Sequence, residues 1–203
     1  MLADRFLRFP DFPELETARL HLREITADDL AWYLSHFSRP EIVRGQGFAA
    51  PADPEAAGRE LRMYILDLFA LRAGFRWGIA LRGDRELIGS VGYYRWLDDP
   101  QPQAEIGYDL APEWWGRGLM TEALGAVLAF GFERMGLARV EAYVMADNGR
   151  SCRILERLGF EREALLSRHG EDEHGRPCDE YRFGLSAPAP ARPEVARPEA
   201  AGA

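Results

Sequence analysis

Apolar and polar residues alternate along Leu20–Ile25, which is the pattern of a half-buried β-strand. Thr26 follows as a candidate helix N-cap with two aspartates in the first turn, so a helix is expected to run to about Phe37. Residues 51–53 open a second helical stretch, whose apolar face consists of Leu61, Ile65, Leu68 and Leu71. Strands are then expected near 76–82, 86–96 and 103–110, with a turn at 98–102.

Helices and strands continue to alternate in the second half of the chain. A helix is expected from about Gly116 to Met135, because its apolar positions follow the spacing i, i+3, i+4 and i+7: Leu124, Val127, Leu128 and Gly131. The remaining expected elements are a strand at 139–145, a short helix at 148–158 with Gly159 as its C-cap, and strands near 160–169 and 178–185. This order predicts an α/β (α+β) fold with a mixed sheet, unlike the regular βαβ repeat of a doubly wound fold.

The two ends of the chain differ in composition from its middle. The length of 203 residues suits one domain with a sizeable core. We expect this domain to span residues 15–185 and to follow an N-terminal arm, residues 1–14, in which Phe6, Phe9 and Phe12 can pack. Residues 186–203 are rich in Ala, Pro, Arg and Glu and are expected to be a disordered tail.

Composition excludes several classes of function. No apolar run reaches the length of a membrane span and no secretory signal is visible, so we expect a cytoplasmic protein without a membrane partner. The net charge of −8 argues against nucleic-acid binding. Cys152 and Cys178 are expected to be reduced thiols. All 25 cationic residues are arginine, and the absence of lysine excludes Walker-type phosphate loops, kinase sites and Schiff-base chemistry.

The segment 105–123 carries the most chemical information. It is expected to form a strand, a tight loop with Gly116 and Gly118, and the first turns of a helix. Such a junction directs free backbone N–H groups and a helix N-terminus at one point, where they bind phosphate oxygens without a basic side chain. The hydroxyl of Thr121 lies in the first helical turn. From the residues alone, a plain tight turn explains the two glycines equally well, because the Rossmann pattern needs a third glycine where Glu122 stands.

A second candidate site lies at Asn148 and Ser151. Asn148 suits a helix N-cap by its residue type and position. Its side-chain amide also suits a hydrogen bond to a ligand amide, although composition alone favours the cap.

Together these segments resemble the GCN5-related N-acetyltransferase (GNAT) superfamily, and within it the RimJ/RimL branch of ribosomal-protein N-terminal acetyltransferases. The resemblance covers roughly residues 15–185. It is carried by Glu105–Tyr108 with Trp115–Ala123, by Asn148-x-x-Ser151, by Leu158–Phe160 and by Leu15–Arg23. It implies a single mixed, mostly antiparallel central sheet flanked by helices, with acetyl-CoA as co-substrate and no metal.

The resemblance also implies which residues hold acetyl-CoA: Leu110, Trp115, Gly116, Arg117, Gly118, Leu119, Met120, Thr121, Asn148 and Ser151. Two loop positions depart from the family pattern. Trp115 stands at the first position, and Met120 at the last, where it puts a larger side chain beside the expected pyrophosphate. Leu155 stands where many members carry a proton-donating tyrosine, so that acid is absent.

The reaction that the resemblance implies is direct attack of a primary amine on acetyl-CoA. An α-amine has a pKa of ~7.7–8.0 and a lysine amine ~10.4, so a protein N-terminus loses its proton more readily. Glu105 is the candidate general base, acting through water, and a solvated strand carboxylate is its equal alternative. A backbone N–H near Leu110 would stabilise the oxyanion, and Ser151 would hydrogen-bond the departing thiolate.

The acceptor amine is expected to lie in a groove lined by Tyr93, Trp96 and Glu171. Trp77 is a further candidate, and core packing is expected for at least two of these three aromatic residues. The turn at 169–174 resembles a metal cluster in composition, but we interpret it as a solvated loop. Alternatives remain open: a small amine or an antibiotic as acceptor, succinyl or another acyl group, a non-catalytic CoA-binding protein, and a monomer or a homodimer.

Overall fold

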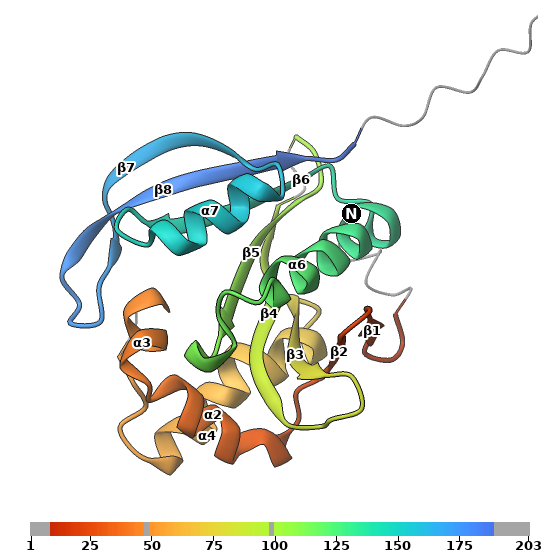
Figure 1. Ribbon diagram of the computed structural model, residues 1–203, viewed down its shortest axis with the longest axis vertical. Helices are drawn as coiled ribbons and strands as arrows, with labels where there is room; N and C mark the ends of the chain where they lie inside the picture. Colours follow the sequence, from red (N-terminus) through yellow and green to blue (C-terminus); the bar gives the residue numbers. More distant parts are fainter. Residues whose placement is uncertain (1–8, 47–48, 98–99, 189–203) are drawn as a thin grey trace, which may run out of the picture.

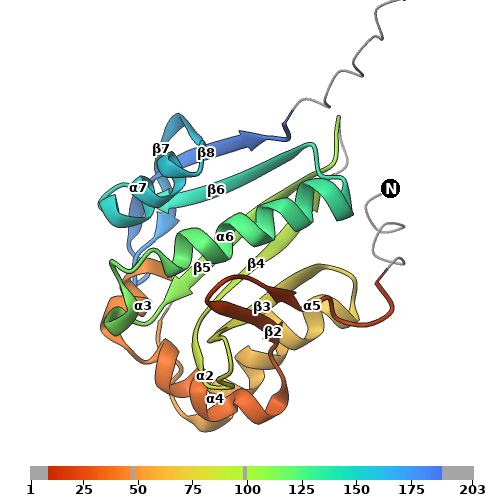
Figure 2. The same ribbon diagram turned by 45° about the vertical axis from the view of Figure 1, so that its right-hand side comes forward.

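Within the residues that the structure describes, 9–46, 49–97 and 100–188, eight strands form one mixed sheet with helices on both faces (Figures 1 and 2). The computed structural model orders the strands β1-β2-β3-β4-β5-β6-β8-β7. Their bounds are β1 Leu15–Glu16, β2 Leu20–Glu24, β3 Gly74–Leu81, β4 Leu87–Leu97, β5 Gln103–Leu110, β6 Arg139–Met145, β7 Glu161–Glu171 and β8 Pro177–Ser186. This arrangement confirms the expected single mixed sheet.

The helical segments cover the sheet and connect its strands. They are η1 Ala27–Asp29, α2 Leu30–Phe37, α3 Pro40–Gln46, α4 Pro54–Leu61, η2 Arg62–Leu66, α5 Asp67–Ala70, η3 Pro112–Trp114, α6 Leu119–Ala129, η4 Phe130–Met135 and α7 Gly149–Arg157. η1 and η3 are 3₁₀ turns, whereas η2 and η4 are π-helical turns. The pattern of the sequence predicted no element where α3 lies.

One neighbouring pair of strands, β5 and β6, runs parallel, and α6 is the crossover between them. In the described chain their ladder covers only residues 103–105 of β5 and 139–141 of β6. Beyond this short ladder the two strands separate toward their carboxyl ends (Figure 2). The sheet is therefore continuous at one end of β5 and open at the other.

Side-chain alternation along the central strands divides the core in two. Trp77 of β3 points to the face that α6 covers and packs in one cluster with Val127. On the opposite face, α2 and α4 pack Tyr33 and Leu61 against Ala80 of β3. Residues of β4 and β5 follow the same rule, so neighbouring residues on one strand serve opposite faces.

Helix ends follow the residues expected to cap them. The Thr26 hydroxyl accepts from the Asp28 N–H at 3.3 Å, and the Asp29 carboxylate accepts from the Thr26 N–H at 2.9 Å. This reciprocal capping box explains why a helical segment starts there.

The predicted apolar face of the second helical stretch is correct for its first part only. Leu61 and Ile65 are buried, but Leu71 is 74% exposed. Ile65 lies within the π-helical turn η2, which precedes Leu71 and places more residues in one turn than an α-helix does. Positions beyond η2 therefore rotate away from the face that simple periodicity assigns to them.

Two phenylalanines of the expected N-terminal arm pack into the core. Phe9 is 5% exposed and contacts Phe75 edge-on at 5.7 Å between ring centroids, and Phe12 contacts Trp77 at 5.7 Å. Phe6, most of the tail and part of the turn at 98–102 lie outside the described residues, so the division into arm, domain and tail stays a prediction.

No helix in the described part of the chain has the length and apolar character needed to cross a membrane. The cytoplasmic location stays a prediction. Both cysteines are free thiols, with Cys152 buried and Cys178 half-buried.

Candidate active site

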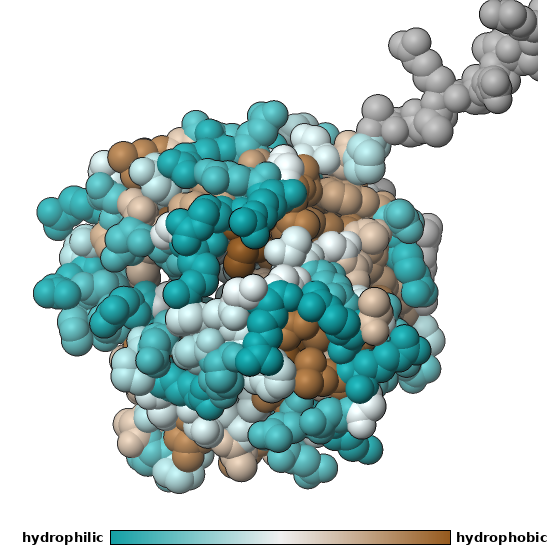
Figure 3. Space-filling view, viewed as in Figure 1, coloured by the Kyte–Doolittle hydropathy of each residue, from teal (hydrophilic) through white to brown (hydrophobic). Residues whose placement is uncertain are grey.

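The separation of β5 and β6 leaves a cleft of about 1030 Å³. One wall consists of β5 and the start of α6, and the other of β6 and the start of α7. Residues of α3, with His169 and Glu180 of the β7–β8 hairpin, line one end. Figure 3 shows the surface hollowed between α7 and α3, with hydrophilic side chains around the opening. A cleft of this size can hold a large part of a nucleotide-sized ligand.

The glycine loop leads into the cleft at the N-terminus of α6. Gly116 and Gly118 have φ values of +74° and +73°, which few other residues adopt, and Gly118 is the N-cap of α6. No described side chain caps this end. The first intrahelical hydrogen bond runs from the Glu122 N–H to the Gly118 carbonyl. The N–H groups of residues 119–121 therefore have no acceptor within the helix. They form a donor cluster suited to phosphate oxygens.

The side chains around this loop are held by the protein itself. Met120 is 4% exposed, packs in the core cluster beneath α6 and is also among the residues that line the cleft. The carboxylate of Glu122 binds Arg19 at 2.6 Å. The side chain of Arg117 stacks on Trp114 at 4.8 Å and is not among the described residues that line the cleft.

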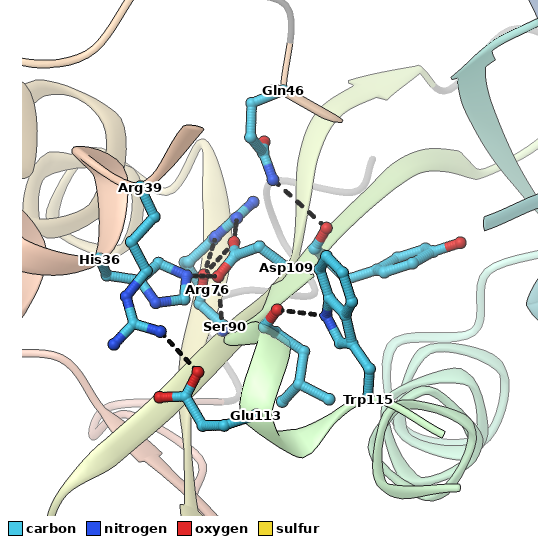
Figure 4. Close-up of polar contacts among 10 residues, drawn as sticks. His36, Arg39, Gln46, Arg76, Ser90, Asp109, Glu113 and Trp115 are labelled. Carbon is cyan, nitrogen blue, oxygen red and sulfur yellow. Dashed lines mark hydrogen bonds and ion pairs between the residues drawn. The ribbon is translucent and has the colours of Figure 1, made fainter. Parts of the chain in front are cut away.

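Trp115 links the two walls of the cleft. Its indole N–H donates to the carbonyl of Leu110 at 2.6 Å, at the end of β5 (Figure 4). The guanidinium of Arg150 on α7 lies over the Trp115 ring at 3.4 Å from its centroid. The tryptophan that departs from the family pattern thus fixes the end of β5 relative to α7.

Backbone groups of β5 face the cleft beyond the short ladder. The Ala111 N–H donates to Ile88 O on β4, so by alternation the N–H and C=O groups of Leu110 and Tyr108 point to the other side. There Trp115 binds the Leu110 carbonyl, and the Gln46 amide of α3 donates to the Tyr108 carbonyl at 3.4 Å (Figure 4). The N–H groups of these two residues point toward the same open side.

Glu105 lies at the last ladder position, on the face of β5 opposite α6. Its side chain is 13% exposed, and Arg95 lies 3.5 Å from its carboxylate. Tyr94 stands directly across from it on β4 and hydrogen-bonds it. Burial, the largest effect, raises the pKa of the Glu105 carboxyl, and the hydrogen bonds and charge from Tyr94 and Arg95 only partly offset it. A carboxylate with a raised pKa at the edge of a cleft suits a general base.

A buried polar cluster lies on the same face of β5, around Asp109, four residues beyond Glu105 (Figure 4). Asp109 accepts from His36 of α2 at 2.7 Å and from Arg76 of β3 at 2.6 Å. Ser90 of β4 donates to it through its N–H at 3.0 Å and its hydroxyl at 2.6 Å. Burial raises the pKa of Asp109, but His36, Arg76 and Ser90 together outweigh it and hold the pKa below its usual range.

Asn148 and Ser151 lie on the opposite wall. The Asn148 side-chain oxygen accepts from the Ser151 N–H at 3.1 Å, so Asn148 is the N-cap of α7 that composition favoured. The capping bond uses the oxygen, so the amide nitrogen is left without a hydrogen-bond partner among the described residues. The Ser151 hydroxyl hydrogen-bonds the phenol of Tyr108 across the cleft.

The expectation that Tyr93 lines an acceptor groove is wrong. Its side chain is 0% exposed, and its hydroxyl donates to Val127 O of α6 at 2.9 Å. Alternation along β4 points Tyr93 to the α6 face and its neighbour Tyr94 to the Glu105 face. Trp77 is also 0% exposed, and its N–H donates to Pro13 O at 2.6 Å.

Trp96 and Glu171 do not reach the cleft either. A bulge at Arg95, whose φ is +59°, inserts one residue into β4, so Trp96 points to the same face as Tyr93 and packs beside it at 6.1 Å. Glu171 is exposed at the end of β7 and is not among the described residues that line the cleft. Among the described residues, no group of three or more His, Cys, Asp or Glu side chains is placed to hold a metal ion.

The sequence comparison decides the family. The Acetyltransferase (GNAT) domain matches residues 19–161. The chain belongs to the GNAT acetyltransferase family. It is 36% identical to the uncharacterized N-acetyltransferase YoaA of Bacillus subtilis (strain 168) over 177 residues, which cover 87% of this chain and 98% of that one.

One further sequence relative and one solved structure belong to the RimJ branch. The GNAT acetyltransferase is 30% identical over 158 residues to the [ribosomal protein uS5]-alanine N-acetyltransferase of Escherichia coli (strain K12), covering 73% and 78% of the two chains. It shares the fold of Mycobacterium smegmatis RimJ in complex with CoA-disulfide, with a TM-score of 0.75, 22% identity and 88% of each chain covered.

Three contacts of this GNAT acetyltransferase were not expected from its sequence: Tyr94 with Glu105, Tyr108 with Ser151, and His36 with Asp109. Tyr94 could have been found, because it stands across from Glu105 once β4 and β5 are paired in register. Tyr108 could have been placed on the α6 face by alternation from Glu105. The contact of His36 with Asp109 joins residues 73 positions apart and carries no local signal.

We predict that Asp109→Asn lowers the free energy of unfolding of this acetyltransferase by about 3–5 kcal/mol at neutral pH, because it leaves Arg76 buried without its counter-charge. The folded-state pKa of Asp109 is depressed, so its contribution is complete above the unfolded value of about 3.9 and is lost as the pH falls through the folded value. Urea unfolding measured from neutral pH to about pH 3 should show that the free energies of unfolding of the variant and of wild type approach each other at acid pH. Exposed Glu86→Gln is the control, and a difference independent of pH contradicts the prediction.

Proposed function

We propose that this GNAT acetyltransferase transfers the acetyl group of acetyl-CoA to an α-amine at a protein N-terminus, by direct attack of the amine. The observation that carries the proposal is that one cleft joins a helix N-terminus with no described side-chain cap at one end to a largely buried carboxylate, Glu105, at the other. The first suits a diphosphate, and the second suits an amine that must lose a proton.

The donor end of the cleft has the groups that a CoA diphosphate needs. The N–H groups of residues 119–121 lie behind two glycines, and an added Cβ at Gly116 would meet no atom within 4 Å. Space and donors are thus both available for phosphate oxygens. On the opposite wall, the amide nitrogen of Asn148, which bonds no other described residue, suits a carbonyl of the pantetheine arm.

The middle of the cleft suits the reacting carbonyl. In our proposal the Leu110 N–H donates to the oxygen on which negative charge develops. Its direction follows from strand alternation, and Trp115 restrains the peptide next to it by binding the Leu110 carbonyl. The Ser151 hydroxyl hydrogen-bonds the departing sulfur. The proposal requires no metal.

The acceptor end suits removal of one proton. Glu105 takes a proton from the ammonium group through a water molecule, and the neutral nitrogen attacks the acetyl carbon. The nitrogen then loses its second proton to water as the amide forms, and the carbon–sulfur bond breaks with its electron pair on the thiolate. An α-amine with a pKa of ~7.7–8.0 needs little help at this step, whereas a lysine amine at ~10.4 needs more. The 30% identity to a ribosomal-protein alanine N-acetyltransferase also supports an α-amine acceptor.

The acceptor class is tested by thiol release from acetyl-CoA with two peptides of one sequence. One has a free N-terminus and no lysine, and the other has a blocked N-terminus and one lysine. At neutral pH the free α-amine should react about 10²-fold faster, because a larger fraction of it is neutral. Faster reaction of the lysine peptide contradicts the α-amine proposal, and no thiol release with any amine contradicts acetyl transfer itself.

Glu105→Gln tests the general base. We expect kcat/KM to fall by about 10²-fold below pH 7 and the loss to shrink above the amine pKa of ~7.7–8.0, where a neutral amine no longer needs a base. Exposed Glu133→Gln is the matched control and should leave the pH profile unchanged. An equal loss at every pH would mean that Glu105 acts in packing or binding only.

Gly118→Val tests the position of the diphosphate. The variant should lose most acetyl-CoA affinity in calorimetry, because a branched side chain at a positive φ displaces the loop and fills the space before α6. Gly83→Val is the control, since Gly83 also has a positive φ of +86° and its added Cβ meets nothing within 4 Å. Normal acetyl-CoA binding by a folded Gly118→Val protein is the result that would rule out this placement.

A further inference from the structure

Tyr108 and Ser151 form a hydroxyl pair across the cleft. Tyr108 lies on β5 and Ser151 in the first turn of α7, and both line the cleft. The phenol oxygen is within hydrogen-bond distance of the Ser151 hydroxyl and lies 3.5 Å from the Ser151 carbonyl. This contact joins the two walls where β5 and β6 have no shared ladder.

The position of Tyr108 follows from the same alternation that sets Glu105 on the other face. The two residues are three apart on β5, so their side chains point to opposite sides of the strand. Glu105 therefore faces the acceptor end, whereas Tyr108 faces the wall formed by α7. Leu155, on the next turn of α7, is 0% exposed and contributes no hydroxyl to the cleft.

We propose that Tyr108 is a positioning residue for thiol release, which donates its phenol hydrogen to Ser151 and so directs the Ser151 hydroxyl hydrogen toward the sulfur of CoA. This inference rests on the proposed function. A phenol has one hydrogen and a serine hydroxyl has one, so once Tyr108 donates to Ser151, the serine hydrogen is left to point elsewhere. Ser151 lines the cleft, so the cleft is the open direction for this hydrogen.

The pair acts as a hydrogen-bond donor to the thiolate and does not change the balance of the reaction. The carbon–sulfur electron pair moves to sulfur, the Ser151 hydroxyl hydrogen-bonds the resulting thiolate, and a proton from water completes the thiol. Burial raises the pKa of the Tyr108 phenol above its usual range, so the phenol keeps its hydrogen throughout the working pH range. A phenol that stays protonated suits orientation of Ser151 rather than proton transfer.

The test measures the pKa of the CoA thiol while CoA is bound, which requires no turnover. The ultraviolet absorbance of the thiolate is followed against pH in the complex with CoA, and the complex with desulfo-CoA is subtracted. Tyr108→Phe keeps the ring and removes only the hydroxyl, and Ser151→Ala removes the second hydroxyl. Tyr181→Phe, on β8 and outside the described cleft lining, is the control.

We expect Tyr108→Phe and Ser151→Ala each to raise the bound thiol pKa by about one unit, a tenfold change in acidity, and to lower kcat with an α-amine peptide by about tenfold or more. Because both residues act through one hydroxyl, the double variant should match Ser151→Ala alone. Tyr181→Phe should match wild type.

Two results overturn the inference while the proposed function stands. One is a Tyr108→Phe protein with the wild-type thiol pKa and kcat. The other is additive effects in the double variant, which would mean that Tyr108 acts on the sulfur without Ser151. A wild-type protein that does not bind CoA overturns the proposed function, and this inference with it.

Discussion

The short parallel ladder between β5 and β6 is the constraint on which the rest of the site depends. Paired residues at 103–105 and 139–141 hold the strands together at one end, and α6 as a crossover fixes their direction. Beyond the ladder the strands separate, and a sheet that is otherwise continuous opens a cleft in its own plane. Backbone groups that a neighbouring strand would have bound become available to a ligand. The Trp115–Arg150 and Tyr108–Ser151 contacts then fix the separated walls relative to each other, and Gln46 holds α3 against β5.

In our account the side chains on the two faces of β5 have different chemical roles. Residues at odd positions, Glu105 and Asp109, lie on the face opposite α6. Burial raises the pKa of Glu105, whereas neighbouring charges and hydrogen bonds outweigh burial at Asp109 and lower its pKa. Glu105 gains a raised pKa and suits proton removal. Asp109 accepts hydrogen bonds from His36, Arg76 and Ser90, and so holds β5 against α2, β3 and β4. Residues at even positions, Tyr108 and Leu110, face the other way. One strand can thus present a base on one face, the Tyr108 phenol on the other face, and the Leu110 N–H toward the opening between the strands.

Much of the fold could be predicted from local pattern. The strands at 103–110 and 139–145, the buried face of α6 and the caps at Thr26 and Asn148 follow from alternation, helical periodicity and residue type. Two of the errors came from single inserted residues. The bulge at Arg95 moved Trp96 to the core face, and the π-helical turn η2 moved Leu71 to solvent. No local pattern marks such insertions. Contacts between distant segments, such as His36 with Asp109, were beyond prediction for the same reason.

Amide hydrogen exchange with and without acetyl-CoA tests the central claim most directly. If the opening between β5 and β6 holds the donor, ligand binding should slow exchange at the N–H groups of Tyr108 and Leu110 and of residues 119–121. Amides of β2 and β3, far from the opening in the strand order, should exchange as before. Saturating acetyl-CoA that leaves exchange at these cleft amides unchanged, while slowing it elsewhere, would contradict the account.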